Sequence, residues 1–369
     1  MGGMRVLLTG TRAPVALDLA RSFRASGHEV HGADHFPVVV MAGELAGFTA
    51  HAAPRFAFDA FAREAESIVS RIKPDLIIPL CEEIFHWTKA SGGRWPLFAP
   101  DLAILMRLHS KFAFIELARS LGLDAPETGH LQDTSDVSDK VLKPEFSRFG
   151  GQVLVRPKSA PRDDDPRNPW LAQAYVPGED LSFHAIASGG QVRAFAAYRS
   201  EWRTRGGASY YFDPVEDALS RRLRVMAETL AAALGLTGQF ACDVRCDGDD
   251  RLWLIECNPR ATSGLHLLAH DPAGLAEAFL SDRDDVLLSD GRPACVGPAM
   301  RLVGWPKALA EGRLGMWQAD IGCARDVFAG KSGAALVGSA QLMLKATLAG
   351  KGLSDFLTAD FECNRDLTC

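Results

Sequence analysis

The sequence predicts a mixed fold in which an α/β domain precedes an α+β region, and three observations lead to this prediction. Strand and helix patterns alternate over residues 1–100, which favours a parallel sheet wound with helices. Residues 170–199 alternate short strands with Pro-Gly and Gly-Gly turns, which favours antiparallel pairing. Residues 238–261 have the pattern of a hairpin with Asp-Gly-Asp-Asp at its tip. With 369 residues the chain is too long for one ordinary core, so several domains are expected.

The N-terminal region contains two strand–helix patterns. It begins with "MRVLLTG" at 4–10, a short apolar strand that ends in a Thr-Gly turn. Apolar residues at helical spacing follow over 14–27, and 28–34 is predicted to be the second strand. A second unit has a helix at 58–74 and a strand at 75–80. These units predict a small doubly wound domain.

The middle and the end of the chain carry further elements. A helix is predicted within 110–128, ending at Gly122, and a strand at 140–146. The strongest helical pattern in the chain is at 217–236, and another helix is predicted near 334–349.

Composition and charge exclude several classes of protein. The formal net charge is −6, which disfavours generic nucleic-acid binding because phosphate neutralisation needs a basic face. No apolar run reaches the roughly 20 residues that span a bilayer, so no membrane association is expected. The N-terminal stretch lacks the features of a signal peptide. The eight cysteines include no C-x-x-C pair, so a cytoplasmic protein without a disulfide framework is expected.

The stretch "RLWLIECNPRAT" is the most informative in the chain. After an apolar run, Glu256, Asn258 and Arg260 alternate, so they share one face of a strand. Asp243 on the partner strand faces the same region if the turn lies near 247–250. Oxygen ligands of this kind suit a Mg²⁺ ion that is shared with substrate phosphates. The alternative to a metal site is a strand end with surface charges and a Glu–Arg contact.

At these residues the sequence resembles the ATP-grasp superfamily, and more closely its carbamoyl-phosphate-synthetase-like and biotin-carboxylase-like ligases. Those proteins carry a hairpin that ends in I-E-x-N-P-R, and the resemblance covers about residues 4–265 in motif order. It implies an ATP-grasp fold with an N-terminal Rossmann-like domain, a lid subdomain, an antiparallel-sheet subdomain with the metal site, and a C-terminal extension packing on the core. The corresponding boundaries are 1–100, 101–177, 178–300 and 301–369.

The resemblance also implies residue roles at the reaction centre. Glu256 and Asn258 would be metal ligands, and Asp243 would be the second acidic ligand. Arg260 would steady the transferring phosphate as a catalytic residue. Lys143 in "KVLKPEF" would reach the α- and β-phosphates, as both a nucleotide-binding and a catalytic residue.

Further motifs resemble the nucleotide-binding parts of the family. Lys111 looks like the first nucleotide lysine, and Gly150 and Gly151 in "SRFGGQ" look like the loop that closes over phosphates. In "LAQAYVPGEDLSF" the backbone near Tyr175 and Val176 would pair with the adenine edge.

The same stretch carries two further nucleotide-binding expectations. Gln173 could assist in binding the adenine. Glu179 and Asp180 are rival ribose ligands, and the sequence does not decide between them.

The acceptor side of the site is less clear from the sequence. "RTRGGAS" resembles the region that borders the acceptor, where Arg203 or Arg205 would hold a carboxylate or phosphate, although a plain charged turn fits equally well. "IIPLCEE" ends a parallel strand, and ligands of open α/β sheets bind beyond such ends. Glu82 or Glu83 is therefore a candidate for the acceptor pocket, with Glu83 the one we select, and an acid at a helix N-terminus is the alternative.

The resemblance implies an ATP-dependent ligase that uses ATP and Mg²⁺ or Mn²⁺. ATP would phosphorylate a small-molecule carboxylate, and an amine would displace the phosphate to form an amide-type bond. One alternative is carboxylation through carboxyphosphate made from bicarbonate. Another is a non-catalytic nucleotide-binding regulator. Many relatives dimerise, so a homodimer is one expectation, although no interface stripe stands out in the sequence.

Overall fold

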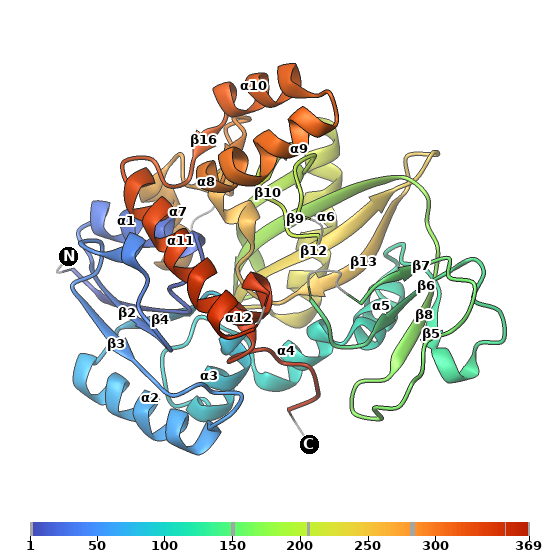
Figure 1. Ribbon diagram of the computed structural model, residues 1–369. Coiled ribbons are helices and arrows are strands. Elements are labelled where there is room, and N and C mark those ends of the chain that lie inside the picture. The colour runs from blue at the N-terminus through green and yellow to red at the C-terminus, as the bar shows by residue number, and fades with distance from the viewer. Residues whose placement is uncertain (1–2, 149–151, 205–206, 281–284, 351, 368–369) are drawn as a thin grey trace.

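The computed structural model describes residues 3–148, 152–204, 207–280, 285–350 and 352–367 (Figure 1). Its elements form an N-terminal parallel sheet, a large central sheet and a small antiparallel sheet, which follow one another from left to right in Figure 1. The predicted mixture of parallel and antiparallel architecture is therefore confirmed.

The N-terminal sheet is parallel, with strand order β3-β2-β1-β4. Its strands are β1 (Arg5–Thr9), β2 (Glu29–Asp34), β3 (Gly47–Ala50) and β4 (Leu76–Pro79). Helices α1 (Val15–Ala25), α2 (Phe58–Ile72) and α3 (Glu83–Ser91) accompany them. Both faces are covered: Val6 and Leu8 pack into the core that contains α1, whereas Leu7 packs with Phe61 of α2 and Trp87 of α3. This double burial explains why three consecutive residues in the middle of the first strand, Val6, Leu7 and Leu8, are apolar.

Two consecutive helices lead from this sheet into the rest of the chain. They are α4 (Leu102–His109) and α5 (Lys111–Ser120). Ser110 separates them and caps α5, because its side chain accepts a hydrogen bond from the Ala113 N–H at 3.0 Å. The cap fixes Lys111 as the first residue of α5.

The small sheet is antiparallel, with strand order β5-β8-β6-β7. It contains β5 (Thr128–His130), β6 (Lys140–Pro144), β7 (Leu154–Val155) and β8 (Trp170–Ala174). Leu142 and Ala172 are cross-strand partners and form a satellite core with Leu131. This sheet lies against the β13 edge of the central sheet, and the Lys143 side chain points toward that edge.

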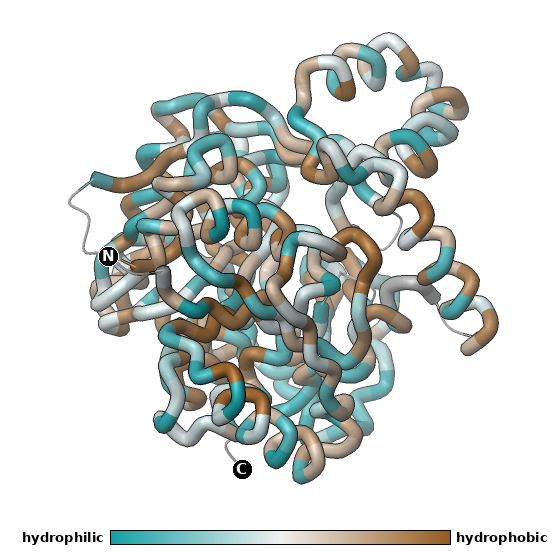
Figure 2. Tube along the Cα trace, turned by 90° about the vertical axis from the view of Figure 1, so that its left-hand side faces the viewer, coloured by the Kyte–Doolittle hydropathy of each residue, from teal (hydrophilic) through white to brown (hydrophobic). Residues whose placement is uncertain are grey.

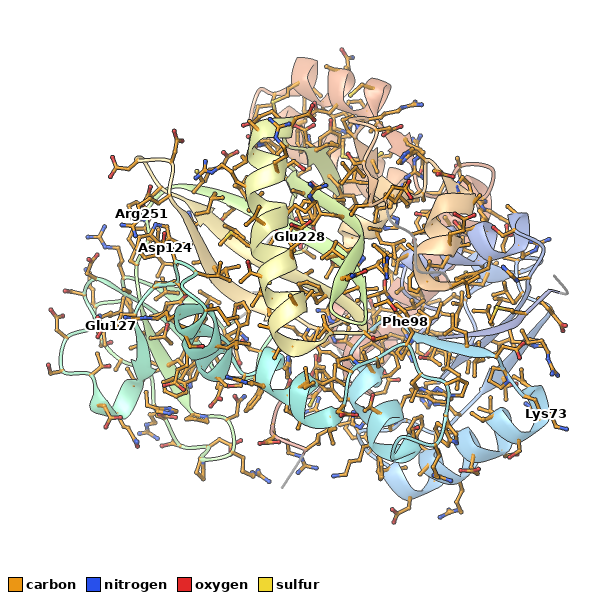
Figure 3. The ribbon with its side chains drawn as sticks, turned by 180° about the vertical axis from the view of Figure 1, so that it is seen from behind. Lys73, Phe98, Asp124, Glu127, Glu228 and Arg251 are labelled. Atoms are coloured by element: carbon orange, nitrogen blue, oxygen red, sulfur yellow. The ribbon has the colours of Figure 1, made fainter. Side chains whose placement is uncertain are left out.

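The central sheet has strand order β13-β12-β9-β10-β11-β15-β16, and β14 pairs with β10. The long strands are β9 (Glu179–Ser188), β10 (Gln191–Arg199), β12 (Gly238–Cys246) and β13 (Leu252–Asn258). The short ones are β11 (Tyr211–Pro214), β14 (Leu287–Leu288), β15 (Ala294–Cys295) and β16 (Arg325–Asp326). Helix α6 (Asp217–Leu234) covers the back of the sheet with its apolar face and turns Glu228 outward (Figure 3).

The last part of the chain is helical and returns to the N-terminal sheet. Its helices are α7 (Pro272–Leu280), α8 (Gly297–Ala299), α9 (Trp305–Ala310), α10 (Leu314–Cys323), α11 (Ser332–Leu348) and α12 (Leu353–Thr358). Figure 2 shows hydrophobic residues interspersed with hydrophilic ones along the chain, and α11 leaves several large apolar side chains exposed, among them Leu336, Val337, Leu344 and Leu348. Within the described residues, none of these helices has the length and apolar character of a bilayer span.

The N-terminal and central sheets are joined by packing and by a buried polar contact. The rings of Phe98 and Phe279 lie 4.9 Å apart at this junction (Figure 3). Asp18 of α1 accepts a 2.6 Å hydrogen bond from His266, and both side chains are buried. An apolar ring contact and a buried hydrogen bond thus both hold the two sheets in position relative to each other.

Candidate functional site

The hairpin of β12 and β13 brings two acids together. Asp243 is the direct cross-strand partner of Glu256, next to an irregularity in the register. The neighbouring pair, Cys242 and Cys257, is buried on the opposite face of the sheet in the core beneath α6. The period-two alternation of the strands therefore directs both carboxylates to the face that looks toward the small sheet.

The two carboxylates have opposite pKa shifts. Burial and the neighbouring Glu256 carboxylate raise the pKa of Asp243 to about 6, although Ser182 donates a 2.7 Å hydrogen bond to it. Burial alone would raise the pKa of Glu256 as well. The positive charges of Lys111 and Lys143 have the larger effect, and the pKa of Glu256 is lowered. Glu256 is therefore the carboxylate held ionised by the protein, and Asp243 is the one that a further cation would stabilise.

The two lysines reach Glu256 from separate elements. Nζ of Lys143, on β6, lies 3.5 Å from Glu256 Oε2, and Nζ of Lys111, at the start of α5, lies 3.8 Å from the same oxygen. Lys111 also donates to the Ser147 carbonyl at 2.9 Å. Burial lowers the pKa of Lys143, which Glu256 only partly offsets. Three elements from distant parts of the chain thus meet at one carboxylate.

A cavity of about 450 Å³ opens beside this cluster, between the small and central sheets. Among the residues that line it are Lys143, Gln173, Tyr175, Val176, Asp180, Arg203, Asp243, Glu256, Asn258 and Arg260. A larger surface hollow of about 730 Å³ lies next to Gly122–Glu127 and Asp247–Asp249. That hollow is shallow, and the Asp124–Arg251 ion pair beside it is exposed (Figure 3). The smaller cavity, which gathers buried charge, is the better candidate site.

The strip from Gln173 to Val176 forms one wall of this cavity. Nε2 of Gln173 donates to Thr128 Oγ1 at 3.0 Å and to the Ile255 carbonyl at 3.4 Å, so its side chain ties the small sheet to β13. Tyr175 lies beneath the Arg156 guanidinium, which is 5.3 Å from the ring centroid. The Tyr175 N–H donates to the Asp139 carbonyl.

The structure separates Glu179 from Asp180. Adjacent residues on β9 point to opposite faces, and of these two only Asp180 lines the cavity. Glu179 instead pairs with Arg199 at 2.9 Å. Asp180 is held by Arg203 at 3.1 Å and by Arg245 at 2.9 Å.

A second charged cluster lies at the far end of the cavity. Nε of Arg260 lies 3.7 Å from Glu82 Oε1, and Nε of Arg148 lies 3.6 Å from the same oxygen. Burial opposes ionisation of Glu82, but the two arginines lower its pKa to about 2. Arg260 also donates to Asn258 Oδ1 at 3.1 Å, which connects this cluster to the end of β13.

Glu83 is directed away from this cluster. Its Oε1 accepts hydrogen bonds from Thr9 Oγ1 and from the Leu80 and Cys81 N–H groups. Burial raises the pKa of Glu83. Its carboxyl group accepts hydrogen bonds from the backbone that directly follows β4. The structure therefore places Glu82, the neighbour of the selected residue, beside the arginines.

Some predicted residues fall outside the described part of the chain, and some site residues were not anticipated. Gly150, Gly151 and Arg205 lie outside the described residues. Arg245 and Tyr198 line the cavity although neither was singled out in the sequence. Arg245 follows Asp243 at the two-residue spacing of a strand, which is a signal that the sequence does contain.

The donor set suits a hard divalent cation. Asp243, Glu256 and Asn258 supply carboxylate and amide oxygens at neighbouring cross-strand positions of one hairpin. A cation there would offset the repulsion that raises the Asp243 pKa. Mg²⁺ and Mn²⁺ both fit this oxygen-rich set.

Comparisons with known proteins agree with this geometry. Residues 108–264 match the family model of the ATP-grasp domain. An N5-carboxyaminoimidazole ribonucleotide synthetase in its ADP complex matches with a TM-score of 0.64 and 15% identity, covering 82% of this chain and 86% of that chain. The ADP-bound Staphylococcus aureus N5-carboxyaminoimidazole synthetase gives 0.62 and 12%, covering 83% and 87%.

An L-amino acid ligase from Bacillus licheniformis gives a TM-score of 0.57 and 12% identity, covering 76% of this chain and 75% of that chain. At these identities the likeness establishes the fold. A search of curated protein sequences gives no match. The hairpin acids, the two lysines and the cavity between the sheets all lie within or beside the matched residues, so the chain contains an ATP-grasp domain at 108–264 and has the ATP-grasp fold.

Proposed function

We propose that this protein is an ATP-dependent ligase that activates a carboxylate as an acyl phosphate, which an amine then attacks to form an amide-type bond. The observation that carries the proposal is the position of Glu256. It is paired across the hairpin with Asp243 and lies within 4 Å of two buried lysines. Members of the ATP-grasp family are ATP-dependent ligases.

The cavity suits a nucleotide lying along the Gln173–Val176 strip. The N–H groups of Ala174 and Tyr175 already donate to the Glu127 and Asp139 carbonyls. We therefore expect the Val176 N–H to be the donor that meets the adenine edge. Asp180 is the expected ribose ligand, because it faces the cavity while Glu179 faces away from it.

The polyphosphate would lie toward the lysines. Lys143 and Lys111 would each exchange part of their contact with Glu256 for phosphate oxygens, which offsets the charge of the triphosphate. A bound Mg²⁺ would supply positive charge that offsets the negative charge of the transferring phosphate. Asp243, Glu256 and Asn258 would hold it.

Arg260 and Arg148 would meet the acceptor. Phosphoryl transfer to a carboxylate brings two anions together, so the reaction needs cations on the acceptor side as well as on the nucleotide side. The two guanidinium groups beside Glu82 line the same cavity as the hairpin acids and can hold a carboxylate or an acyl phosphate.

ADP release in a panel of carboxylates with amines, and of bicarbonate without amine, tests the proposal. We expect MgATP-dependent ADP release with at least one carboxylate–amine pair, and its loss in Lys143→Ala. Release with bicarbonate alone would instead indicate carboxylation through carboxyphosphate. Calorimetric binding of MgATP with no release on any acceptor would indicate a nucleotide-binding regulator.

The cellular location is part of the same proposal. The cysteines that the structure describes are free thiols, which fits a reducing compartment such as the cytoplasm.

A further inference from the structure

The residues that follow α12 lie against the acceptor side of the candidate site. Asp360 pairs with Arg12 through two 2.8 Å contacts, and Arg12 also pairs with Asp34 at the end of β2. The Arg12 guanidinium also contacts two aromatic rings, at 4.2 Å from the centroid of Phe36 and 4.9 Å from the centroid of Phe361. The segment is therefore fixed at the carboxyl ends of the parallel strands, where ligands of open α/β sheets bind.

Two buried histidines hold the backbone of the same segment. Nε2 of His86 lies 3.2 Å from the Phe361 carbonyl, and Nε2 of His109 lies 2.7 Å from the Cys363 carbonyl. Burial lowers the pKa of each histidine to about 4, so both rings are neutral at pH 7. Because a carbonyl only accepts, each ring donates from Nε2.

The segment also contacts the arginine cluster directly. The Cys363 N–H donates to Glu82 Oε2 at 3.2 Å, while Oε1 of the same carboxylate faces Arg148 and Arg260. The guanidinium of Arg148 lies 5.5 Å from the centroid of the Phe361 ring. Glu82 thus has one oxygen for the C-terminal segment and one for the two arginines.

We propose that Asp360, Phe361 and Cys363 form a positioning element of the active site. The element holds Oε2 of Glu82, so that Oε1 orients Arg148 and Arg260 toward the acceptor. This inference rests on the proposed function for the role of the two arginines. Partners that hold metal-ligating side chains in place are worth about 10- to 100-fold in activity, and we expect a loss of the same order here. The C-terminal segment would then be required for transfer rather than for nucleotide binding.

Substitutions in the segment test this role through kinetics. We expect Asp360→Asn and Phe361→Leu to lower kcat for ADP release about 10- to 100-fold, with the KM for MgATP unchanged. Asp355→Asn is the matched control, because Asp355 on α12 is exposed and the substitution should leave kcat unchanged. Circular dichroism establishes folding. Unchanged kcat in both folded variants, or an equal loss in Asp355→Asn, would overturn the proposal.

Hydrogen exchange tests the Glu82 contact without any acceptor. We expect Glu82→Gln to increase amide exchange in the peptide that covers residues 359–367, because the Cys363 N–H loses an ionised acceptor. Unchanged exchange would overturn the proposal. If the wild-type protein releases no ADP with any acceptor, the proposed function fails, while the exchange measurement still decides whether the segment and Glu82 are coupled.

Discussion

At the residue scale, the chemistry depends on how one carboxylate is shared. Glu256 lies between a buried acid and two buried lysines. Its negative charge can therefore bind a metal ion and also stabilise the charged form of the lysines. We expect Glu256→Gln to lower turnover about 100-fold or more, since preorganised charge at a transferring phosphoryl group is worth several kcal/mol. Steady-state ADP release measures this, and the exposed Glu228→Gln on α6 is the control. Equal turnover in the two variants would contradict the assignment.

Glu82 makes a pH-dependent contribution to stability. Its carboxylate is buried, and Arg148 and Arg260 lower its pKa from 4.5 to about 2. A depressed carboxylate pKa stabilises the folded protein above the unfolded pKa, and this contribution is lost as the pH falls from about 4.5 toward 2. We expect Glu82→Gln to lower the free energy of unfolding by about 3 kcal/mol at pH 7.

Urea unfolding of both proteins between pH 7 and pH 3 measures this contribution. The difference between wild type and Glu82→Gln should shrink as the medium becomes acidic. A difference that stays constant over that range would mean that the arginines do not hold Glu82 ionised.

At the element scale, the turn between β8 and β9 positions the nucleotide wall. Gly178 has a φ of +135°, and a Cβ there would meet the Cys246 carbonyl oxygen at 2.0 Å. Gly178→Ala must therefore displace the turn from β12, and we expect a loss of about 2–3 kcal/mol in stability together with weaker MgATP binding. Thermal unfolding and calorimetry measure the two effects.

Gly189 is the matched control for this turn. It also has a positive φ, +56°, but a Cβ there meets no atom within 4 Å. Gly189→Ala should cost only about 1 kcal/mol and leave MgATP binding intact. A similar loss of nucleotide affinity in both variants would show that the close approach of Gly178 to β12 is unimportant.

The elements also show what the sequence could predict. The hairpin register was predictable, because period-two alternation and an Asp-Gly-Asp-Asp turn together determine which side chains share a face. Strand β3 and helices α3 and α4 were not predicted, since short half-buried segments carry weak periodicity. The positions of Glu82 and Glu83 depend on partners far along the chain, including Cys363, and no local pattern encodes such contacts.

At the scale of the whole molecule, the site depends on keeping the N-terminal and central sheets together. Asp18 and His266 form a buried contact at this junction, and Arg325 lies 3.8 Å from the other Asp18 oxygen. We expect Asp18→Asn to lower the free energy of unfolding by about 2–4 kcal/mol, because the buried His266 ring and the Arg325 guanidinium lose a carboxylate partner. Urea unfolding measures this loss.

A more exposed carboxylate–histidine contact is the control for the buried contact between Asp18 and His266. Glu29 and His31 lie 2.8 Å apart on the surface of the N-terminal sheet. Glu29→Gln should change the free energy of unfolding by less than about 1 kcal/mol. Equal effects of the two substitutions would show that burial at the junction does not strengthen the contact.

We propose that the hairpin acids and the buried lysines together bind a metal–nucleotide complex. Isothermal calorimetry of ATP binding, with and without Mg²⁺, to wild type, Glu256→Gln and Lys143→Ala is the sharpest test of this site. We expect binding that requires Mg²⁺ in the wild type, loses its Mg²⁺ dependence in Glu256→Gln, and is weakened in Lys143→Ala. Binding of equal strength in all three proteins with or without Mg²⁺, or no binding to the wild type, would contradict it.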